Sequence, residues 1–227
     1  MEAIVDTNNA VTLLGGGEVS AAALRAALAR APVLVAADGG ADRALALGHC
    51  PAAVVGDLDS LSAAGRAALP AARVHHVPDQ DSTDFDKCLQ AVRAPLLLAL
   101  GFTGARLDHT LASFSTLARF AARRCVMLGG GDLCFLAPPQ LTLALPVGTR
   151  LSLFPMAPAT GRSRGLRWPI DGLRFAPAGV IGTSNETAAP RVALGFDAPG
   201  MLVLAPEATL DAVLPALAEA PHWPALS

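Results

Sequence analysis

Charged residues are scarce in this chain of 227 residues: they make up 16% of it, against about 25% in typical globular proteins. Hydrophobic residues make up 52%, which excludes an intrinsically disordered protein. The formal net charge is −2 and no basic run is present, so a nucleic-acid binder that works by charge is excluded as well. We therefore expect small-molecule partners.

Long apolar segments, basic leader sequences and paired cysteines are also absent. The longest uncharged stretch, Leu133–Thr149, contains three prolines and is too short for a membrane-spanning helix of about 20 apolar residues. The chain begins Met-Glu-Ala-Ile-Val-Asp, which is acidic where a signal peptide is basic, so we expect a cytoplasmic protein. No Cys-x-x-Cys pair occurs among Cys50, Cys88, Cys125 and Cys134, and we expect reduced thiols without a zinc or redox site.

Short apolar runs alternate with helical patterns through the first 135 residues. We expect buried strands at Val11–Leu14, Val33–Ala37, Ala53–Val55, Leu96–Leu100 and Cys125–Leu128. We expect helices at Ser20–Arg30, Asp42–Leu47, Ser82–Arg93 and Asp108–Arg123. This alternation predicts an α/β domain of three layers, in which helices cover both faces of a parallel sheet.

After Ala137 the helical patterns give way to short alternating runs, and proline and glycine recur every few residues. The runs are Thr149–Phe154, Leu173–Phe175, Arg191–Leu194 and Met201–Leu204. They predict a small all-β sandwich, so we expect an α/β domain at residues 1–137 and a β-sandwich domain with a C-terminal tail at residues 138–227. The tail has a weak helical pattern at 209–218, which Pro215 interrupts.

Aspartates follow four of the apolar segments, at the point where each segment ends. The positions are Asp38 after Val33–Ala37, Asp57 and Asp59 after 53–56, Asp79, Asp81 and Asp84 after 73–77, and Asp108 after Leu96–Leu100. In a parallel sheet these ends share one edge, where open α/β folds bind ligands. Carboxylates gathered there repel one another, so the pattern predicts Mg²⁺ and a nucleotide polyphosphate at this edge.

Glycines and basic side chains accompany these carboxylates. The glycines Gly39, Gly40, Gly101 and Gly104 would let the backbone approach a phosphate without an intervening Cβ. Lys87, the chain's only lysine, and Arg106 would supply positive charge. We therefore expect an ATP-like ligand beside these residues.

Each feature also has a purely structural interpretation. Asp38, Asp81 or Asp108 could simply cap the next helix, although capping does not explain four acidic turns on one edge. Gly15–Gly17 could hold a phosphate or form a turn. His109 could lie near the phosphates or be an ordinary polar residue at a helix start.

Four ordered motifs resemble those of the thiamine pyrophosphokinase family. They are Ala37-Asp-Gly-Gly-Ala41, Gly56-Asp-Leu-Asp-Ser60, Pro78-Asp-Gln-Asp-Ser-Thr-Asp-Phe-Asp-Lys-Cys-Leu89 and Gly101-x-x-Gly-x-Arg-x-Asp-His109. The resemblance extends through Gly165-Leu-Arg-Trp168 and Gly182-Thr-Ser-Asn185. It implies an ATP- and Mg²⁺-binding α/β domain, a thiamine-binding β-sandwich domain, and a homodimer whose thiamine site lies between subunits. The implied reaction transfers pyrophosphate from ATP to thiamine and releases AMP.

The resemblance also implies roles for particular residues. Asp57 and Asp59, with Asp38, Asp84 and Asp108 around them, would hold Mg²⁺ and the triphosphate, and Gln80 and Asp84 would border the substrate. Trp168 and Ser184 would contact thiamine from the second domain. Two positions depart from the family pattern: Leu58 replaces an aromatic residue and Ala105 replaces a glycine. Both changes spare the polar groups, so they bear on local packing more than on the chemistry.

The chemistry of the reaction suggests how these residues would act. An alcohol attacks the β-phosphorus in line while AMP leaves, so catalysis depends on positioning and charge neutralisation. Asp84 is our choice for the carboxylate that accepts the hydroxyl proton, and Trp168 would stack on the cationic thiazolium, unless it is a core residue. Two alternatives remain: the same reaction on another alcohol such as a pterin, or a nucleotide-sensing module without catalysis.

Overall fold

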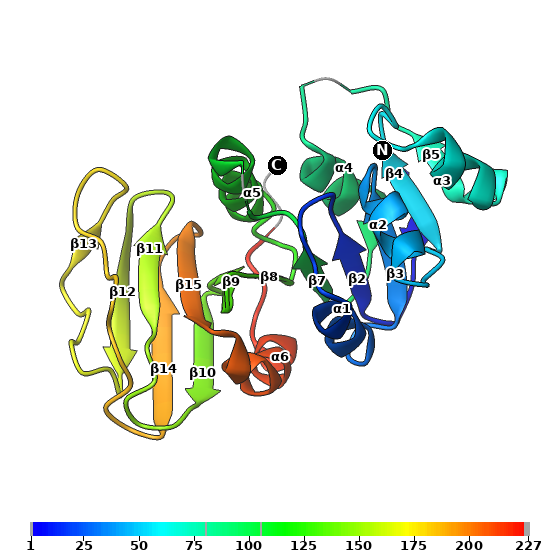
Figure 1. Ribbon diagram of the computed structural model, residues 1–227. Helices are drawn as coiled ribbons and strands as arrows, with labels where there is room; N and C mark the ends of the chain where they lie inside the picture. Colours follow the sequence, from blue (N-terminus) through cyan, green and yellow to red (C-terminus); the bar gives the residue numbers. More distant parts are fainter. Residues whose placement is uncertain (1, 80, 105, 225–227) are drawn as a thin grey trace. The chain divides into compact units, whose positions relative to one another are not determined.

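The computed structural model describes residues 2–79, 81–104 and 106–224, and it is a mixed α/β structure (Figure 1). The chain divides into two compact units, Met1–Thr116 with Met127–Gly130, and Leu117–Val126 with Gly131–Ser227. Residues 131–137, which we expected to end the first domain, count with the second unit because β9 (Asp132–Leu136) pairs with β15 (Met201–Pro206).

The first unit alternates strands and helices. In chain order its elements are β1 (Val5–Asp6), β2 (Val11–Leu14), α1 (Ala21–Leu28), β3 (Val33–Ala37), α2 (Gly40–Ala46), β4 (Ala53–Gly56), α3 (Ala63–Ala68), η1 (Ala71–Arg73), β5 (Val74–His76), α4 (Asp84–Ala91), β6 (Val92–Arg93), β7 (Leu97–Leu100), α5 (Leu107–Arg119) and β8 (Cys125–Gly129). The division between the units falls within α5 and β8.

The main sheet of this unit has the strand order β8-β7-β2-β3-β4-β5. All the pairs that join β7, β2, β3, β4 and β5 are parallel, so their carboxyl ends lie on one edge, as predicted for the strands that precede the acidic turns. The first of these strands in the chain, β2, lies between β3 and β7. The direction of winding therefore reverses beside β2, and open α/β sheets bind ligands at such a reversal.

Burial explains the apolar composition of these strands. Every residue of β2, β4 and β7 is buried, which requires cover on both faces of the sheet. Polar caps explain where the helices begin: Ser20 Oγ accepts the Ala23 N–H at 3.1 Å, and Ser62 Oγ accepts the Gly65 N–H at 2.9 Å. The expected helix Ser82–Arg93 is shorter than predicted, because Val92 and Arg93 pair as β6 with β1.

The second unit is built mainly from antiparallel strands. In chain order its elements are β9 (Asp132–Leu136), β10 (Gln140–Ala144), β11 (Ser152–Pro155), β12 (Ala159–Arg164), β13 (Arg174–Phe175), β14 (Arg191–Phe196), β15 (Met201–Pro206), η2 (Glu207–Thr209) and α6 (Leu210–Glu219). One sheet has the order β10-β14-β12-β13, and β15 pairs separately with β9 and β11. The expected helix at 209–218 forms as α6 and contains Pro215. Within the described part of the chain, no helix combines the length and the hydropathy needed to cross a membrane.

Glycines allow the loops at the carboxyl edge to pack backbone against backbone. A Cβ on Gly15 would lie 2.5 Å from the Gly101 carbonyl oxygen, and a Cβ on Gly40 would lie 2.1 Å from the Leu14 carbonyl oxygen. The close approach of α2 to the end of β2 therefore requires glycine at position 40. This packing requirement is separate from the phosphate contact predicted for Gly40.

We expect Gly40→Ala to destabilise the fold. The added methyl group clashes with rigid backbone, so the free energy of unfolding should fall by roughly 1 to 3 kcal/mol. Gly16→Ala is a matched control, because its Cβ would meet nothing nearer than 3.9 Å. Thermal unfolding measures both, and equal melting temperatures for the two variants would contradict this packing argument.

Candidate active site

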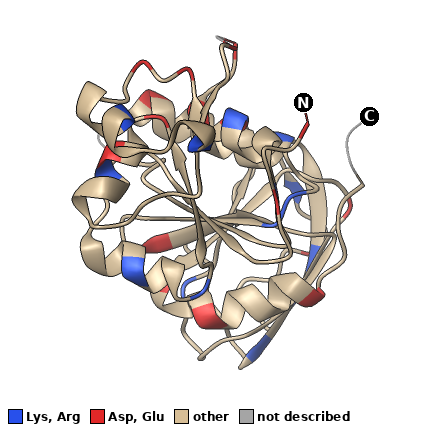
Figure 2. Cartoon of the chain, turned by 90° about the vertical axis from the view of Figure 1, so that its right-hand side faces the viewer, with Lys and Arg blue, Asp and Glu red and all other residues tan. Residues whose placement is uncertain are grey.

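Acidic and basic residues are scattered along the chain (Figure 2), and their numbers differ between the two units. The first unit contains twelve Asp and Glu against eight Lys and Arg, whereas the second contains seven against nine. The excess of negative charge in the first unit favours cationic ligands there.

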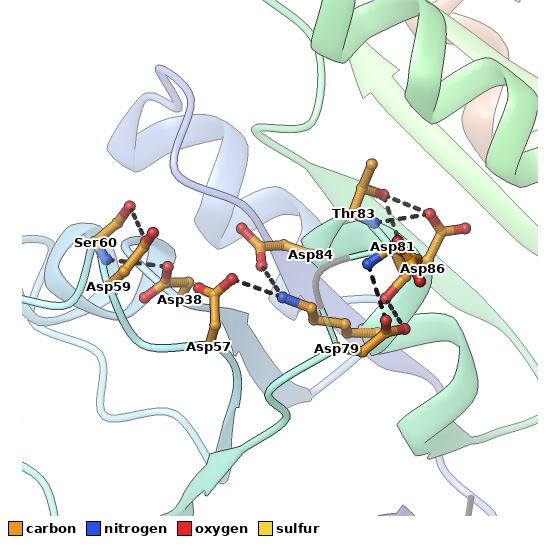
Figure 3. A network of polar contacts seen from close by, with 11 residues as sticks. Asp38, Asp57, Asp59, Ser60, Asp79, Asp81, Thr83, Asp84 and Asp86 are labelled. Carbon is orange, nitrogen blue, oxygen red and sulfur yellow. Dashed lines mark hydrogen bonds and ion pairs between the residues drawn. The ribbon is translucent and has the colours of Figure 1, made fainter.

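Three carboxylates meet at the carboxyl ends of two neighbouring strands. Asp38 follows β3, and Asp57 and Asp59 follow β4. Each contributes one oxygen to a group whose atoms all lie within 4.8 Å of one another (Figure 3). Adjacent strands are about 4.8 Å apart, so the parallel pairing of β3 with β4 itself brings these side chains together.

Backbone strain marks the same turns. Asp38 and Leu58 have positive φ angles of 42° and 64°, and among the described non-glycine residues only Ser184, at 60°, shares this conformation. Leu58 packs against a core cluster that contains Ala36 and Val54. The strained turn thus directs Leu58 into the core, while the carboxylates on either side of it join the group. Such strain concentrates at functional sites.

Asp38 is the buried member of the group. Its side chain is 1% exposed, Oδ2 accepts the Ser60 N–H at 3.1 Å, and Oδ1 has no hydrogen-bond partner among the described residues. The pKa of Asp38 is raised to about 6, chiefly by burial and in part by the nearby carboxylates of Asp59 and Asp84, although the hydrogen bond from Ser60 opposes this rise. A buried, unpartnered oxygen beside two further carboxylates fits a hard divalent cation such as Mg²⁺, which prefers oxygen ligands.

Lys87 provides the internal counter-charge. Its ammonium group, 2% exposed, donates to Asp57 Oδ2 at 2.9 Å and lies 3.6 Å from Asp84 Oδ1 (Figure 3). The hydrogen bond from Lys87 lowers the pKa of Asp57. Burial lowers the pKa of Lys87, but the two carboxylates outweigh this effect and raise it above its ordinary value. Burial raises the pKa of Asp84 despite the attraction of Lys87.

A hydrogen-bond network that the sequence patterns did not predict fixes the start of α4. Asp86, 1% exposed, accepts hydrogen bonds from the Thr83 N–H at 3.0 Å and the Thr83 hydroxyl at 2.8 Å. The Thr116 hydroxyl of α5 also donates to Asp86, at 3.0 Å. The Thr-x-x-Asp spacing is a readable signal of a capping box. This network fixes the helix that carries Asp84 and Lys87.

The turn after β7 contributes differently. Arg106 Nη2 donates to Asp108 Oδ2 at 2.6 Å, and both side chains are about two-thirds exposed. The hydrogen bond from Arg106 lowers the pKa of Asp108. Because β7 is three strands from β4, this turn begins about 14 Å along the edge, and Asp108 is not in the three-carboxylate group. Gly104 and His109 are exposed, and Gly101 has a φ of 74°.

Among the remaining predicted site residues, Gln80 lies outside the described residues, and Trp168 and Ser184 belong to the second unit. The structure joins the segments that carry these two. The Asn185 side chain accepts the Trp168 N–H at 3.3 Å and donates to the Trp168 carbonyl at 2.7 Å. The Ser184 N–H donates to Ser152 Oγ at 3.0 Å. Trp168 is 52% exposed, so it is not a core residue of the described structure.

The fold and the site define a mixed α/β protein with a carboxylate site, suited to a divalent cation, at the edge of parallel strands. Residues 24–128 match the family model described as thiamin pyrophosphokinase, catalytic domain. A thiamine pyrophosphokinase 1 from Oryza sativa subsp. japonica is 30% identical over 190 residues, which cover 69% of this chain and 72% of that protein. The chain therefore belongs to the thiamine pyrophosphokinase family.

Solved structures share the fold. A thiamin pyrophosphokinase from Candida albicans superposes with a TM-score of 0.75 at 15% identity, covering 88% of this chain and 90% of that one. The yeast thiamin pyrophosphokinase superposes with a TM-score of 0.72 at 19% identity, covering 94% and 92%. At these identities the structures establish the fold alone.

We expect Asp38→Asn to stabilise the metal-free protein in a pH-dependent way. The pKa of Asp38 is raised, so its protonated form stabilises the fold below about pH 4, and this contribution is lost as the pH rises through about 6. At about pH 7.5 without metal, the free energy of unfolding of the Asp38→Asn variant should exceed that of the unchanged protein by about 2 to 3 kcal/mol, which raises the melting temperature by several degrees. At about pH 4 the gain should vanish.

Thermal unfolding in a chelator across this pH range measures the effect. Asp81→Asn, which removes an exposed carboxylate at the same edge, is the control and should change the melting temperature little. A gain for Asp38→Asn that is equal at both pH values would contradict the assignment.

Proposed function

We propose that this chain transfers pyrophosphate from ATP to the hydroxyethyl group of thiamine, giving thiamine diphosphate and AMP. Its membership of the thiamine pyrophosphokinase family supports this enzyme class. The observation that carries the proposal is the group of Asp38, Asp57 and Asp59, with its buried unpartnered oxygen, at the sheet edge. No carboxylate of the motifs is missing, which disfavours a sensing module without catalysis, and the matched relatives do not favour a pterin substrate.

Asp38, Asp57 and Asp59 would hold one Mg²⁺. Asp84, and Asp108 farther along the edge, stay predicted ligands for metal ions and the triphosphate. Bound Mg²⁺ would supply positive charge to the phosphates of ATP. Before ATP binds, Lys87 neutralises part of the charge of Asp57 and Asp84. We propose that the same ammonium group binds phosphate oxygens when they arrive.

We place the triphosphate along the carboxyl edge, beside the reversal of the sheet at β2. The turns after β3 and β7 at this edge contain Gly39, Gly40, Gly101 and Gly104, the glycines that we expected beside phosphate. Arg106 and His109 lie at the start of α5 and are exposed, so they are free to approach ATP. The pair of Arg106 with Asp108 would orient the guanidinium.

In the transfer step, the hydroxyl oxygen of thiamine attacks the β-phosphorus. The bond from that phosphorus to the oxygen it shares with the α-phosphorus breaks, and AMP leaves with the electron pair. The hydroxyl proton passes to a carboxylate, for which we propose Asp84. Its raised pKa, caused by burial, makes it a better proton acceptor than an ordinary aspartate.

For thiamine we propose contacts with Gln80, Asp84, Trp168 and Ser184. An exposed indole is a suitable surface for the cationic thiazolium. We also propose a homodimer with the thiamine site between subunits, which sedimentation can measure. The cytoplasmic location expected from the sequence stays a prediction.

The product distinguishes this reaction from simple phosphoryl transfer. With purified protein, ATP, Mg²⁺ and thiamine, we expect AMP and thiamine diphosphate to accumulate in equal amounts. Chromatography of the nucleotides measures AMP against ADP. ADP as the product, or turnover only with another alcohol, would refute the proposed function.

We expect Asp57→Asn and Asp59→Asn each to lower kcat by about 10²-fold or more, because each removes a predicted metal ligand. Steady-state kinetics at saturating Mg²⁺ measures this, with Asp81→Asn as the control. Circular dichroism should show an intact fold for all three variants. Near-normal turnover in either test variant would remove that residue from the ligand set.

A further inference from the structure

The ring of Trp168 is covered on one side by its neighbour in the chain. The guanidinium carbon of Arg167 lies over the ring, 4.9 Å from its centre. Arg167 Nη1 donates to Glu186 Oε1 at 2.5 Å, and the Arg167 N–H donates to the Glu186 carbonyl at 2.9 Å. Arg167, Trp168 and Glu186 all belong to the second unit.

The backbone beneath this arrangement is fixed on both sides. Asn185, 5% exposed, bonds to both the N–H and the carbonyl of Trp168, and it also accepts the Glu186 N–H at 2.8 Å. Leu166 forms a bridge with Thr187, which continues the pairing of the two segments. Gly165 allows a further close contact just before these residues, since a Cβ there would lie 2.3 Å from the Arg191 carbonyl oxygen. The half-exposed indole is therefore held in place by hydrogen bonds to the Trp168 backbone and by the Arg167 guanidinium over one face of its ring.

We propose that Arg167 and Glu186 are positioning residues that make Trp168 a one-sided platform for thiamine. This inference rests on the proposed function, in which Trp168 contacts thiamine. Arg167 closes one face of the indole, so a flat cationic ring can stack only on the opposite face. Holding the ring in place before thiamine arrives reduces the ordering cost of binding.

Glu186 has a second effect in this arrangement. A lone guanidinium on one face would repel a cation that approaches the other, because the two charges lie on either side of one ring. The carboxylate of Glu186 is bonded directly to Arg167 and compensates its charge. The pair therefore keeps the electron-rich free face of Trp168 available to a cation.

The main test replaces both members of the pair by neutral groups of similar shape, Arg167→Gln with Glu186→Gln. This change removes the contact without altering the net charge. We expect the KM for thiamine to rise about 3- to 10-fold, while kcat and the KM for ATP stay within about two-fold. Arg164→Gln, on the exposed side of β12, is the control and should leave all three constants unchanged.

Glu186→Gln alone separates positioning from charge. It leaves the Arg167 charge uncompensated, so we expect a higher KM for thiamine than in the double variant. The second substitution, Arg167→Gln, should therefore partly restore thiamine binding. If neither variant raises the KM for thiamine by more than about two-fold, the pair is an ordinary surface ion pair and the proposal is wrong.

Fluorescence tests the covered face without any turnover. In a Trp223→Phe background Trp168 is the only tryptophan, and quenching by acrylamide reports access to its ring. We expect the quenching constant to rise about 1.5- to 2-fold in the double variant, because both faces become accessible. An unchanged quenching constant would contradict the proposed cover by Arg167.

Trp168→Ala keeps the two proposals distinguishable. If this variant leaves the KM for thiamine unchanged, the proposal that Trp168 contacts thiamine is wrong. If it raises the KM while the Arg167 and Glu186 double variant does not, only the positioning inference fails. If the protein makes no thiamine diphosphate at all, the proposed function fails, and the quenching experiment still decides whether Arg167 covers the ring.

Discussion

The repulsion among three carboxylates at one sheet edge is the constraint on which the site depends. Asp38, Asp57 and Asp59 are close enough to share one cation, and Asp38 is buried with an unpartnered oxygen. The protein compensates this charge only in part. Lys87 pairs with Asp57 and Asp84, while no basic side chain among the described residues forms an ion pair with Asp38 or Asp59. The remaining negative charge favours an external cation. The raised pKa of Asp38 reflects the same repulsion, because its ionised form is less stable here than in an ordinary aspartate.

Several separate structural features keep the three carboxylates together despite their repulsion. The parallel pairing of β3 with β4 brings the turns together, and positive φ angles at Asp38 and Leu58 keep them in shape. Glycines at 15, 40 and 101 let the neighbouring loops pack closely. The network of Thr83, Asp86 and Thr116 fixes α4, so that Lys87 reaches the carboxylates. The core, in which β2, β4 and β7 are completely buried, compensates the energetic cost of this strain.

The two units carry different chemistry. The first is acidic, and its polar groups suit a metal ion and phosphates. The second has a slight excess of arginine, and its distinctive feature is an exposed indole whose surroundings are fixed by Asn185, Arg167 and Glu186. Negative charge attracts a cation, and an exposed indole is a suitable surface for a cationic aromatic ring.

Much of this organisation is readable from the sequence, because it depends on local patterns. Apolar runs, caps and strand-end aspartates predict the parallel strands, the helices between them and the shared acidic edge, and four ordered motifs identify the family. What the pattern cannot decide is distance along that edge. Asp108 follows a strand end as Asp57 does, yet it is outside the carboxylate group because β7 lies on the far side of β2.

Side-chain partners were likewise beyond the sequence. The burial of Asp38 and Lys87, the link from Asp86 to Thr116 and the cover of Trp168 by Arg167 all depend on segments that are brought together by folding. The sequence by itself determined which residues could carry charge and where the strands end. Only the tertiary structure decided which charges meet, because strand order, and not position in the chain, sets the distances over which carboxylates repel and cations pair.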